Sequence, residues 1–296
     1  MSDITVTFRN GATSYYLNDG TEFLLIRHEG LGMAPVRRLT EQGPYQHGVT
    51  DRGFRILPRQ VLLGIVALAA SPEEIYDRHE KLLEALAPSN DPIIVIFGYP
   101  GGRRREMDAH FLSGLRFPTF NRLGYSEEVV MELFCPEGTL RAVDPSVETA
   151  GLGAVGSGYA VPVPVPILVG ASALDQTLSI TSTGMFLVYP VIKIEGSIGD
   201  LKIENLMTDE KLDFAGLDIG DGHWYEIDLA YGTKTVVDDV GDNKIADLTD
   251  DSDLATWHLG AAPEVAGGVN DIQVTGTGIN DNTRITLTYY CRYVGL

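Results

Sequence analysis

The stretch VLLGIVALAASPEEIYDRHEKLLEALAP, residues 61–88, is the most informative part of the chain. It opens with an almost wholly apolar run, Val61 to Ala70, which is typical of a buried strand. Ser71-Pro72-Glu73-Glu74 then combines an N-cap, a proline suited to the first helical position and the glutamate of a capping box. The stretch therefore predicts a buried strand followed at once by a helix over residues 72–87, with Pro88 as its stop.

The expected helix has one apolar face, because five side chains recur at helical spacing: Ile75, His79, Leu82, Leu83 and Leu86. The opposite face carries Glu74/Arg78 and Asp77/Lys81, which are spaced for favourable ion pairs. On such a face a histidine is expected to be a hydrogen-bonded core residue and not a metal ligand. This is the clearest helix that the sequence predicts.

The rest of the first half is expected to be mostly strands. Asn10-Gly11 predicts a turn, and Tyr15–Leu17 with Phe23–Arg27 predict a hairpin around Asn18-Asp19-Gly20. Residues 30–44 carry a loop-rich composition. Tyr99-Pro100-Gly101-Gly102 has proline and glycine in the order that a type II turn requires. The remaining expected strands are Ile4–Phe8, Pro92–Phe97, Glu106–Leu112 and Glu127–Phe134.

Residues 151–170 are expected to be an ordered linker or arm. Gly151, Gly153 and Gly156 match a dinucleotide-binding fingerprint on paper, but that fingerprint must open a helix. The VPVPVP run at Val161–Pro166 favours extended backbone and excludes a helix there. A linker between two domains, residues 1–150 and 171–296, is the better interpretation.

The second half predicts a β-sandwich. Short strands alternate with turns rich in glycine, aspartate and asparagine, which is the pattern of antiparallel sandwiches and jelly rolls. The expected strands are Leu178–Thr181, Met185–Glu195, Leu201–Asn205, Lys211–Phe214, Trp224–Leu229, Thr233–Val237, Ala255–His258, Asp271–Val274 and Arg284–Tyr293.

The net charge and the cysteine content limit the classes of function that the chain can have. The net charge is −19, of which residues 149–296 carry −14. Such acidity argues against nucleic-acid binding through a basic patch, and fits either a wall along which DNA slides or an ordinary solubility device. Cys135 and Cys291 lie far apart and are expected to be buried thiols in a reducing cytoplasm. No apolar run is long enough to predict a membrane span, and the first residues do not resemble a signal peptide.

The sequence offers no catalytic, metal or cofactor residue. No G-x-S-x-G nucleophile motif occurs, and none of the six histidines stands at metal-ligand spacing from another ligand. Acidic residues crowd residues 238–253, but they lack the EF-hand pattern, so a solvated loop is expected there and a calcium site is the alternative. We therefore expect a protein that is not an enzyme and uses no cofactor.

Two sets of residues remain as weak binding candidates. Arg103, Arg104 and Arg105 follow a predicted turn, where they are either solvated or interface contacts, since arginine is enriched at interfaces. Trp224 and Trp257 are the only tryptophans. An exposed indole can stack on a sugar, whereas a tryptophan in the core of a sandwich is the more ordinary role.

In the order and spacing of its motifs, the chain resembles the distal tail proteins of long-tailed, non-contractile bacteriophages. Four places carry the resemblance: the Tyr15–Leu17 and Phe23–Ile26 pair, Pro44-x-x-His47-Gly48 with Arg55-Ile56-Leu57, the strand leading into Ser71–Leu82, and a second half that opens with Pro190–Gly196 and ends with Ile285–Tyr293. The Gly/VPVPVP linker and the acidic second half depart from the family's pattern.

The resemblance implies a mostly β protein with a first domain of α+β type. That domain is a tail-tube-like β domain with one packed helix, followed by a galectin-like β-sandwich. It implies a structural virion protein, a distal tail ring subunit that joins the tail tube to the baseplate hub or receptor-binding apparatus. The expected partners are other copies in a hexameric ring, the tail tube protein, the hub or tail-tip protein, the tape measure protein and side fibres. DNA would pass through unbound. The alternative is a carbohydrate-binding protein that recognises a host-surface glycan through the second domain.

Overall fold

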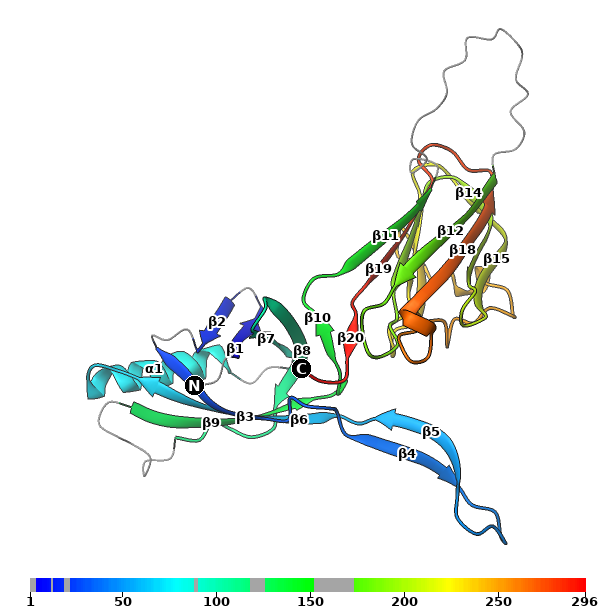
Figure 1. Ribbon diagram of the computed structural model, residues 1–296. Helices are drawn as coiled ribbons and strands as arrows, with labels where there is room; N and C mark the ends of the chain where they lie inside the picture. The colour runs from blue at the N-terminus through cyan, green and yellow to red at the C-terminus, as the bar shows by residue number, and fades with distance from the viewer. Residues whose placement is uncertain (1–3, 12, 19–21, 88–89, 118–125, 152–172) are drawn as a thin grey trace, which may run out of the picture. The chain divides into compact units, whose positions relative to one another are not determined.

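The computed structural model describes residues 4–296 except 12, 19–21, 88–89, 118–125 and 152–172. The chain forms two compact units, Met1–Val143 with Tyr293–Leu296, and Asp144–Arg292 (Figure 1). The boundary expected at residue 150 therefore differs from the observed one, because strand β11 (Ser146–Gly151) pairs with β19 (Arg284–Tyr289) in the second unit. The last four residues also return to the first unit. Apart from Gly151, the expected linker lies outside the described residues.

The first unit is built on a nine-stranded sheet whose main path runs β2-β1-β7-β8-β9-β6-β3. Strand β6, predicted from the apolar run, pairs with β3 on one side and with β9 on the other. The strands of the sheet are β1 (Thr5–Asn10), β2 (Thr13–Leu17), β3 (Phe23–Glu29), β6 (Arg59–Leu68), β7 (Ile93–Tyr99), β8 (Arg103–Phe111), β9 (Ser126–Cys135), β10 (Leu140–Ala142) and β20 (Arg292–Tyr293).

The hairpin expected between Tyr15–Leu17 and Phe23–Arg27 is wrong. Strand β2 pairs with β1 across the Asn10-Gly11 turn, whereas β3 pairs with β6. Among the described residues, the Asn18 backbone N–H, just after β2, donates to Phe23 O at the start of β3 over 2.9 Å. The Asn18 side chain also donates to Ile4 O and accepts from the Leu25 N–H, so Asn18 contacts both β3 and the residue before β1.

Helix α1 (Pro72–Ala85) begins as the sequence predicts. The Ser71 hydroxyl accepts from the Glu74 N–H, and Glu74 accepts from the Ala70 N–H over 2.7 Å. The helix ends two residues before the expected end, at Ala85. The helix buries Ile75, Leu82 and Ala85, and the residue that follows it, Leu86, is also buried. Leu83, expected on the same face, is exposed.

Residues 36–56 form a separate two-stranded sheet, β4 (Val36–Glu41) with β5 (Thr50–Ile56). Figure 1 shows this hairpin, which we call the arm, projecting from the body of the first unit. The expectation of a loop over residues 30–44 is therefore wrong for β4. The strand has no buried residue, so it lacks the alternation by which a strand is recognised.

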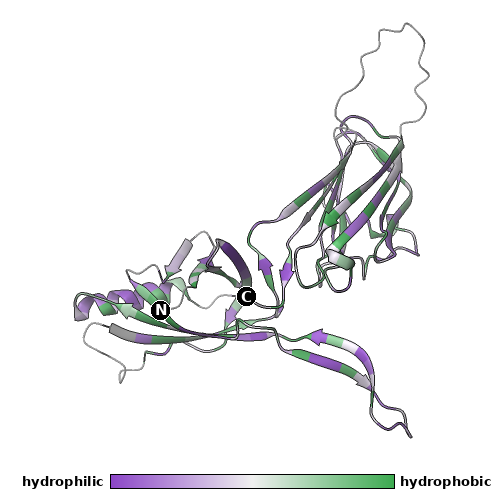
Figure 2. Ribbon diagram, viewed as in Figure 1, coloured by the Kyte–Doolittle hydropathy of each residue, from purple (hydrophilic) through white to green (hydrophobic). Residues whose placement is uncertain are grey.

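The second unit is a sandwich of two antiparallel sheets. One has the order β11-β19-β13-β16-β17 and the other β12-β18-β14-β15. Along β13, β17, β18 and β19 buried residues alternate with more exposed ones, as expected for strands with one face on a core, and Figure 2 shows hydrophobic and hydrophilic colours alternating in this unit. The remaining elements are β12 (Ala173–Thr181), β13 (Val191–Glu195), β14 (Ile198–Asn205), β15 (Glu210–Ile219), β16 (Trp224–Asp228), β17 (Thr235–Asp238), η3 (Ile245–Asp247), η4 (Ala266–Gly268) and β18 (Val269–Thr277). The strand expected at Ala255–His258 is instead a turn followed by extended chain.

Candidate functional site

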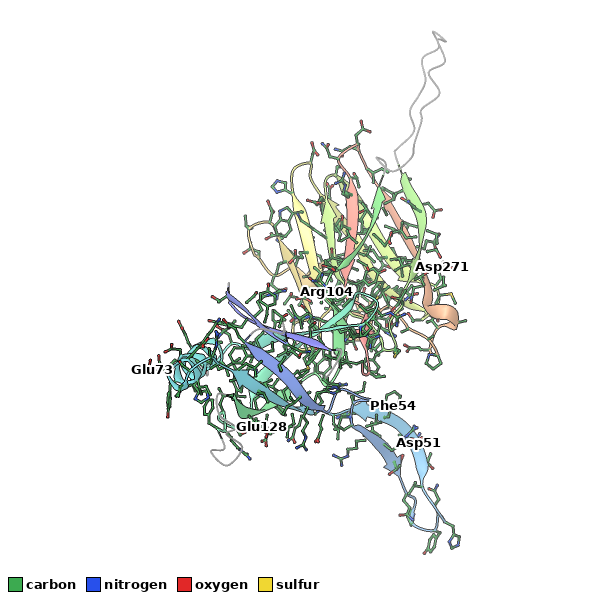
Figure 3. The ribbon with its side chains drawn as sticks, turned by 60° about the vertical axis from the view of Figure 1, so that its left-hand side comes forward. Asp51, Phe54, Glu73, Arg104, Glu128 and Asp271 are labelled. Carbon is green, nitrogen blue, oxygen red and sulfur yellow. The ribbon has the colours of Figure 1, made fainter. Side chains whose placement is uncertain are left out.

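The arm is a surface of the first unit that the described part of its own chain leaves uncovered. Both faces of its two strands are exposed or half-exposed along their whole length. Tyr45, near the tip, is 99% exposed and Phe54, at the centre of β5, is 51% exposed. Figure 3 shows Asp51 and Phe54 on the arm, away from the side chains that crowd the body. A two-stranded sheet alone in water is marginally stable at best, so this arm suits contact with another chain.

The arm carries four arginines and two acidic residues. Two of the arginines are paired within it, Arg38 with Asp51 at 3.1 Å and Arg52 with Glu41 at 2.7 Å. Arg37 and Arg55 lie directly opposite each other in the strand register. Like charges in this position repel each other, and within the described residues neither arginine has an acidic partner.

The three arginines expected at the β7–β8 turn have different roles. Gly101 adopts a φ of +91°, as the predicted type II turn requires, and Arg103 and Arg104 follow it on the surface. Arg105 is buried: its guanidinium lies 3.8 Å from the centre of the Tyr293 ring and donates to Gly295 O. Arg105 thus binds the last residues of the chain and is unavailable to a partner.

Arg59 is a second buried arginine that holds these last residues, and sequence reasoning missed it. Its side chain is 1% exposed and donates three hydrogen bonds to backbone carbonyls, to Gly138 (2.8 Å), Gly30 (3.1 Å) and Val294 (2.6 Å). Burial lowers the pKa of Arg59. The one sequence signal for this role is the position of Arg59 two residues before the apolar run that begins at Val61. The segment Tyr293–Leu296 is thereby a structural part of the first unit.

The two tryptophans lie in different surroundings. Trp257 is 0% exposed, so burial removes it as a sugar platform. Trp224 is half-buried at the start of β16 on the outer face of its sheet, with the Lys193 ammonium 5.0 Å from the ring centre. Of the two indoles, only Trp224 can meet a ligand.

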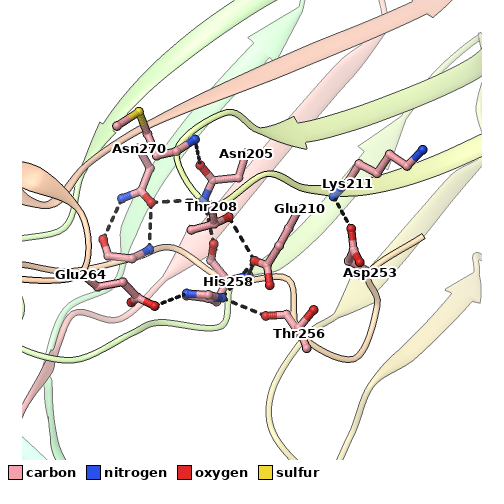
Figure 4. A network of polar contacts seen from close by, with 11 residues as sticks. Asn205, Thr208, Glu210, Lys211, Asp253, Thr256, His258, Glu264 and Asn270 are labelled. Atoms are coloured by element: carbon pink, nitrogen blue, oxygen red, sulfur yellow. Dashed lines mark hydrogen bonds and ion pairs between the residues drawn. The ribbon is translucent and has the colours of Figure 1, made fainter. Parts of the chain in front are cut away.

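A buried polar network that the sequence did not reveal surrounds His258 (Figure 4). The ring Nδ1 lies 3.0 Å from Glu210 and 2.9 Å from Thr256 O, and Nε2 lies 3.2 Å from Glu264. Beside it, Asn205 donates to His258 O and to Asn270 Oδ1, and Asn270 exchanges two hydrogen bonds with the backbone of Gly260. These contacts fix the chain between β15 and β18, so the network has a structural role.

Neither cysteine is placed for chemistry. Both are free and buried, and burial raises the pKa of Cys135 to about 12, which keeps it as an unreactive thiol. Within the described residues, no group of histidine, cysteine, aspartate and glutamate is arranged to hold a metal ion. In the same part of the chain, no helix has the length and apolar character needed to cross a bilayer.

Comparison with known proteins gives a likeness of fold. No family model and no curated protein matches the chain. A solved structure of SPP1 Dit (gp 19.1), described as a paradigm of the hub adsorption apparatus in phages that infect Gram-positive bacteria, is similar with a TM-score of 0.63 and 12% identity, and the match covers 98% of both chains. A chain of the phage P2 baseplate, in its activated conformation with Ca, gives a TM-score of 0.43 and 9% identity over 97% of both chains, too distant to carry an argument.

The likeness to SPP1 Dit defines the class of fold: a mostly β protein, with one helix in the described residues, that shares the architecture of a phage distal tail protein. Because the match spans both units, the resemblance inferred from the order of the sequence motifs is confirmed at the level of the fold.

Proposed function

We propose that this chain is a structural subunit of a bacteriophage tail, which forms a ring at the distal end and joins the tail tube to the baseplate hub or receptor-binding apparatus. The shared fold over 98% of both chains supports a tail or baseplate role. The observation that carries the proposal is the arm, an exposed hairpin that its own chain leaves without cover.

A ring subunit needs two different surfaces that meet head to tail, since such contacts close into cyclic symmetry. The arm supplies one such surface on the first unit. Arg103 and Arg104 at the β7–β8 turn are additional contact candidates, because they remain exposed and arginine is favoured at interfaces. In this proposal the second unit faces the remaining tail components.

The proposed partners follow from that position. Other copies complete a ring, most simply a hexamer, which binds the tail tube protein on one side and the hub or tail-tip protein on the other. The tape measure protein and side fibres are further partners. A net charge of −19 repels DNA and lets it pass without binding. In this proposal the chain is not an enzyme, is assembled in the host cytoplasm and resides at the distal end of the tail.

Mass photometry of the purified chain over a range of concentrations tests the proposal, together with electron microscopy of labelled chain on purified cognate tails. We expect one closed species at a multiple of 32.2 kDa and label at the distal tail end. A variant in which Glu41 is joined to Thr50 by a short turn removes the tip of the arm and should weaken assembly. A chain that stays monomeric throughout and leaves tails unlabelled would exclude this function.

Glycan recognition through the second unit is the second candidate, and one observation favours it: Trp224 is accessible on an outer sheet face beside Lys193. An indole with charged neighbours can stack on a sugar ring while the neighbours hydrogen-bond its hydroxyls. Binding of the chain to host cell-wall polysaccharide, lost in Trp224→Ala and retained in Trp257→Phe, would support it. Equal binding by the wild type and Trp224→Ala would exclude glycan recognition through Trp224.

A further inference from the structure

The arm and helix α1 lie at opposite ends of the first unit (Figures 1 and 3), with Phe54 labelled on the arm and Glu73 at the start of the helix. A contact between these two surfaces therefore has to join two copies of the chain. Resting on the proposed ring, we propose that the arm of one copy docks on the exposed face of α1 in the next copy, through the opposed arginines Arg37 and Arg55.

The charge of α1 complements that of the arm. The helix holds five acidic and two basic residues, whereas the arm holds four arginines and two acidic residues. Four carboxylates lie at spacings of four, three and four residues, so they form one stripe along the helix. All four are exposed, and within the described residues none forms an ion pair: Glu73, Asp77, Glu80 and Glu84.

The spacing of the charges also matches. Directly opposed residues on neighbouring strands have Cβ atoms about 4.5–5.5 Å apart, which applies to Arg37 and Arg55. Glu80 and Glu84 are one helical turn apart, about 5–6 Å between Cβ atoms. Two guanidinium groups at one spacing can therefore meet two carboxylates at nearly the same spacing, and arginine binds carboxylates in a two-pronged geometry.

The helix also offers apolar surface next to this stripe. Tyr76 and Leu83 are 59% and 51% exposed and stand seven residues apart, on the same side of the helix. Phe54 of the arm lies next to Arg55 in β5 and therefore on the opposite face, where it is opposed to Arg38, so it is not part of this contact. Docking would remove the apolar surface of the helix from water and neutralise two arginines that repel each other while unpaired.

The two spacings also determine how the elements cross. Arg37 and Arg55 lie side by side across the two strands, whereas Glu80 and Glu84 follow each other along the helix, so the strands of the arm cross α1 at a steep angle when both pairs form. Because each copy carries both surfaces, the contact repeats from copy to copy.

Charge exchange between copies gives a direct test. One variant carries Arg37→Glu with Arg55→Glu, and the other carries Glu80→Arg with Glu84→Arg. We expect each variant alone to need at least a tenfold higher concentration than wild type for half-assembly in mass photometry. An equimolar mixture should assemble within about threefold of the wild-type concentration, because each acidic arm then meets a basic helix and each basic arm an acidic helix.

Arg284→Glu and Asp281→Arg serve as matched controls, since both residues are exposed in the second unit and belong to neither surface. As a second readout, Arg55→Cys chains mixed with Glu80→Cys chains should be joined by a short bismaleimide into heterodimers; neither chain alone should form them, because the native cysteines are buried. If each charge variant alone forms rings at the same concentration as the wild type, this contact is excluded, whereas the proposed ring is still supported. A mixture that fails to recover would also overturn this contact. A wild-type chain that never self-associates would exclude both.

Discussion

Removal of the Arg59 guanidinium should unfold the first unit far more easily while leaving the second unit unchanged. Arg59→Met keeps most of the apolar stem but deletes all three hydrogen bonds, to the carbonyls of Gly30, Gly138 and Val294. Bonds from a charged donor contribute about 1.5–3 kcal/mol each, about 4.5–9 kcal/mol for three. Methionine avoids the cost of burying a charge, which offsets part of this loss. The expected net decrease in the free energy of unfolding is about 3–5 kcal/mol.

Two optical signals separate the units in a urea titration. Both tryptophans, Trp224 and Trp257, belong to the second unit, so their fluorescence reports that unit alone, whereas far-ultraviolet circular dichroism reports both. We expect Arg59→Met to lower the midpoint of the dichroism transition that belongs to the first unit and to leave the fluorescence midpoint in place. Arg103→Met, on the surface of the same unit, should change stability by less than about 0.5 kcal/mol. A loss below about 1 kcal/mol for Arg59→Met, or an equal shift of both signals, would refute this assignment.

Three further changes test other parts of the structure. Ser71→Ala should cost about 1 kcal/mol in the first unit, seen by circular dichroism, because it removes the hydroxyl that caps α1; an unchanged midpoint would contradict the cap. Asn270→Leu should cost about 3 kcal/mol in the second unit, seen by tryptophan fluorescence, because it leaves the buried N–H and C=O of Gly260 unpaired; Gln273→Leu, on the same strand but half-exposed, is the control. Cys135 should resist a thiol reagent at pH 8, because a pKa of about 12 leaves only about one Cys135 side chain in ten thousand as the thiolate. It should react once urea unfolds the chain. Rapid labelling of Cys135 in the folded chain would contradict its burial.

The sequence predicted best the features that neighbouring residues determine. Ser71, Pro72 and Glu74 act within one turn of each other, so the start of α1 and its capping contacts could be predicted directly. The strand before it was predicted because its apolar run is continuous. The end of α1 was placed two residues too late, because no glycine or asparagine marks it and Leu86 continues the apolar pattern beyond the last helical turn.

Features that depend on distant residues could not be predicted. The partner of β2 is β1 and not β3, a choice that the turn signal around Asn18 does not contain. Strand β4 is exposed on both faces and so shows none of the alternation that a half-buried strand shows. Tyr293–Leu296 is too short to carry any periodicity, and its place in the first unit depends on Arg59 and Arg105, far away in the sequence.

The candidate surfaces show the same division. Arg103 and Arg104 could be placed on a turn because Pro100 and Gly101 mark one. The neighbouring Arg105 proved to be internal because it contacts the Tyr293 ring and Gly295 O, which are far away in the sequence. Trp257 was a candidate only because a tryptophan's burial cannot be judged without its fold. The sequence analysis identified ion pairs on α1 but not its acidic stripe, and the complement of that stripe, Arg37 opposite Arg55, depends on a strand register that only the structure shows.

Negative-stain electron microscopy of the purified chain, with two-dimensional class averages, is the most direct test of the central claim that this is a ring subunit. The account predicts closed rings of one fixed number of copies, which disappear when the arm arginines are changed by Arg37→Glu with Arg55→Glu. Averages that show only single particles of monomer size at every concentration, with no ring on cognate tails, would contradict it.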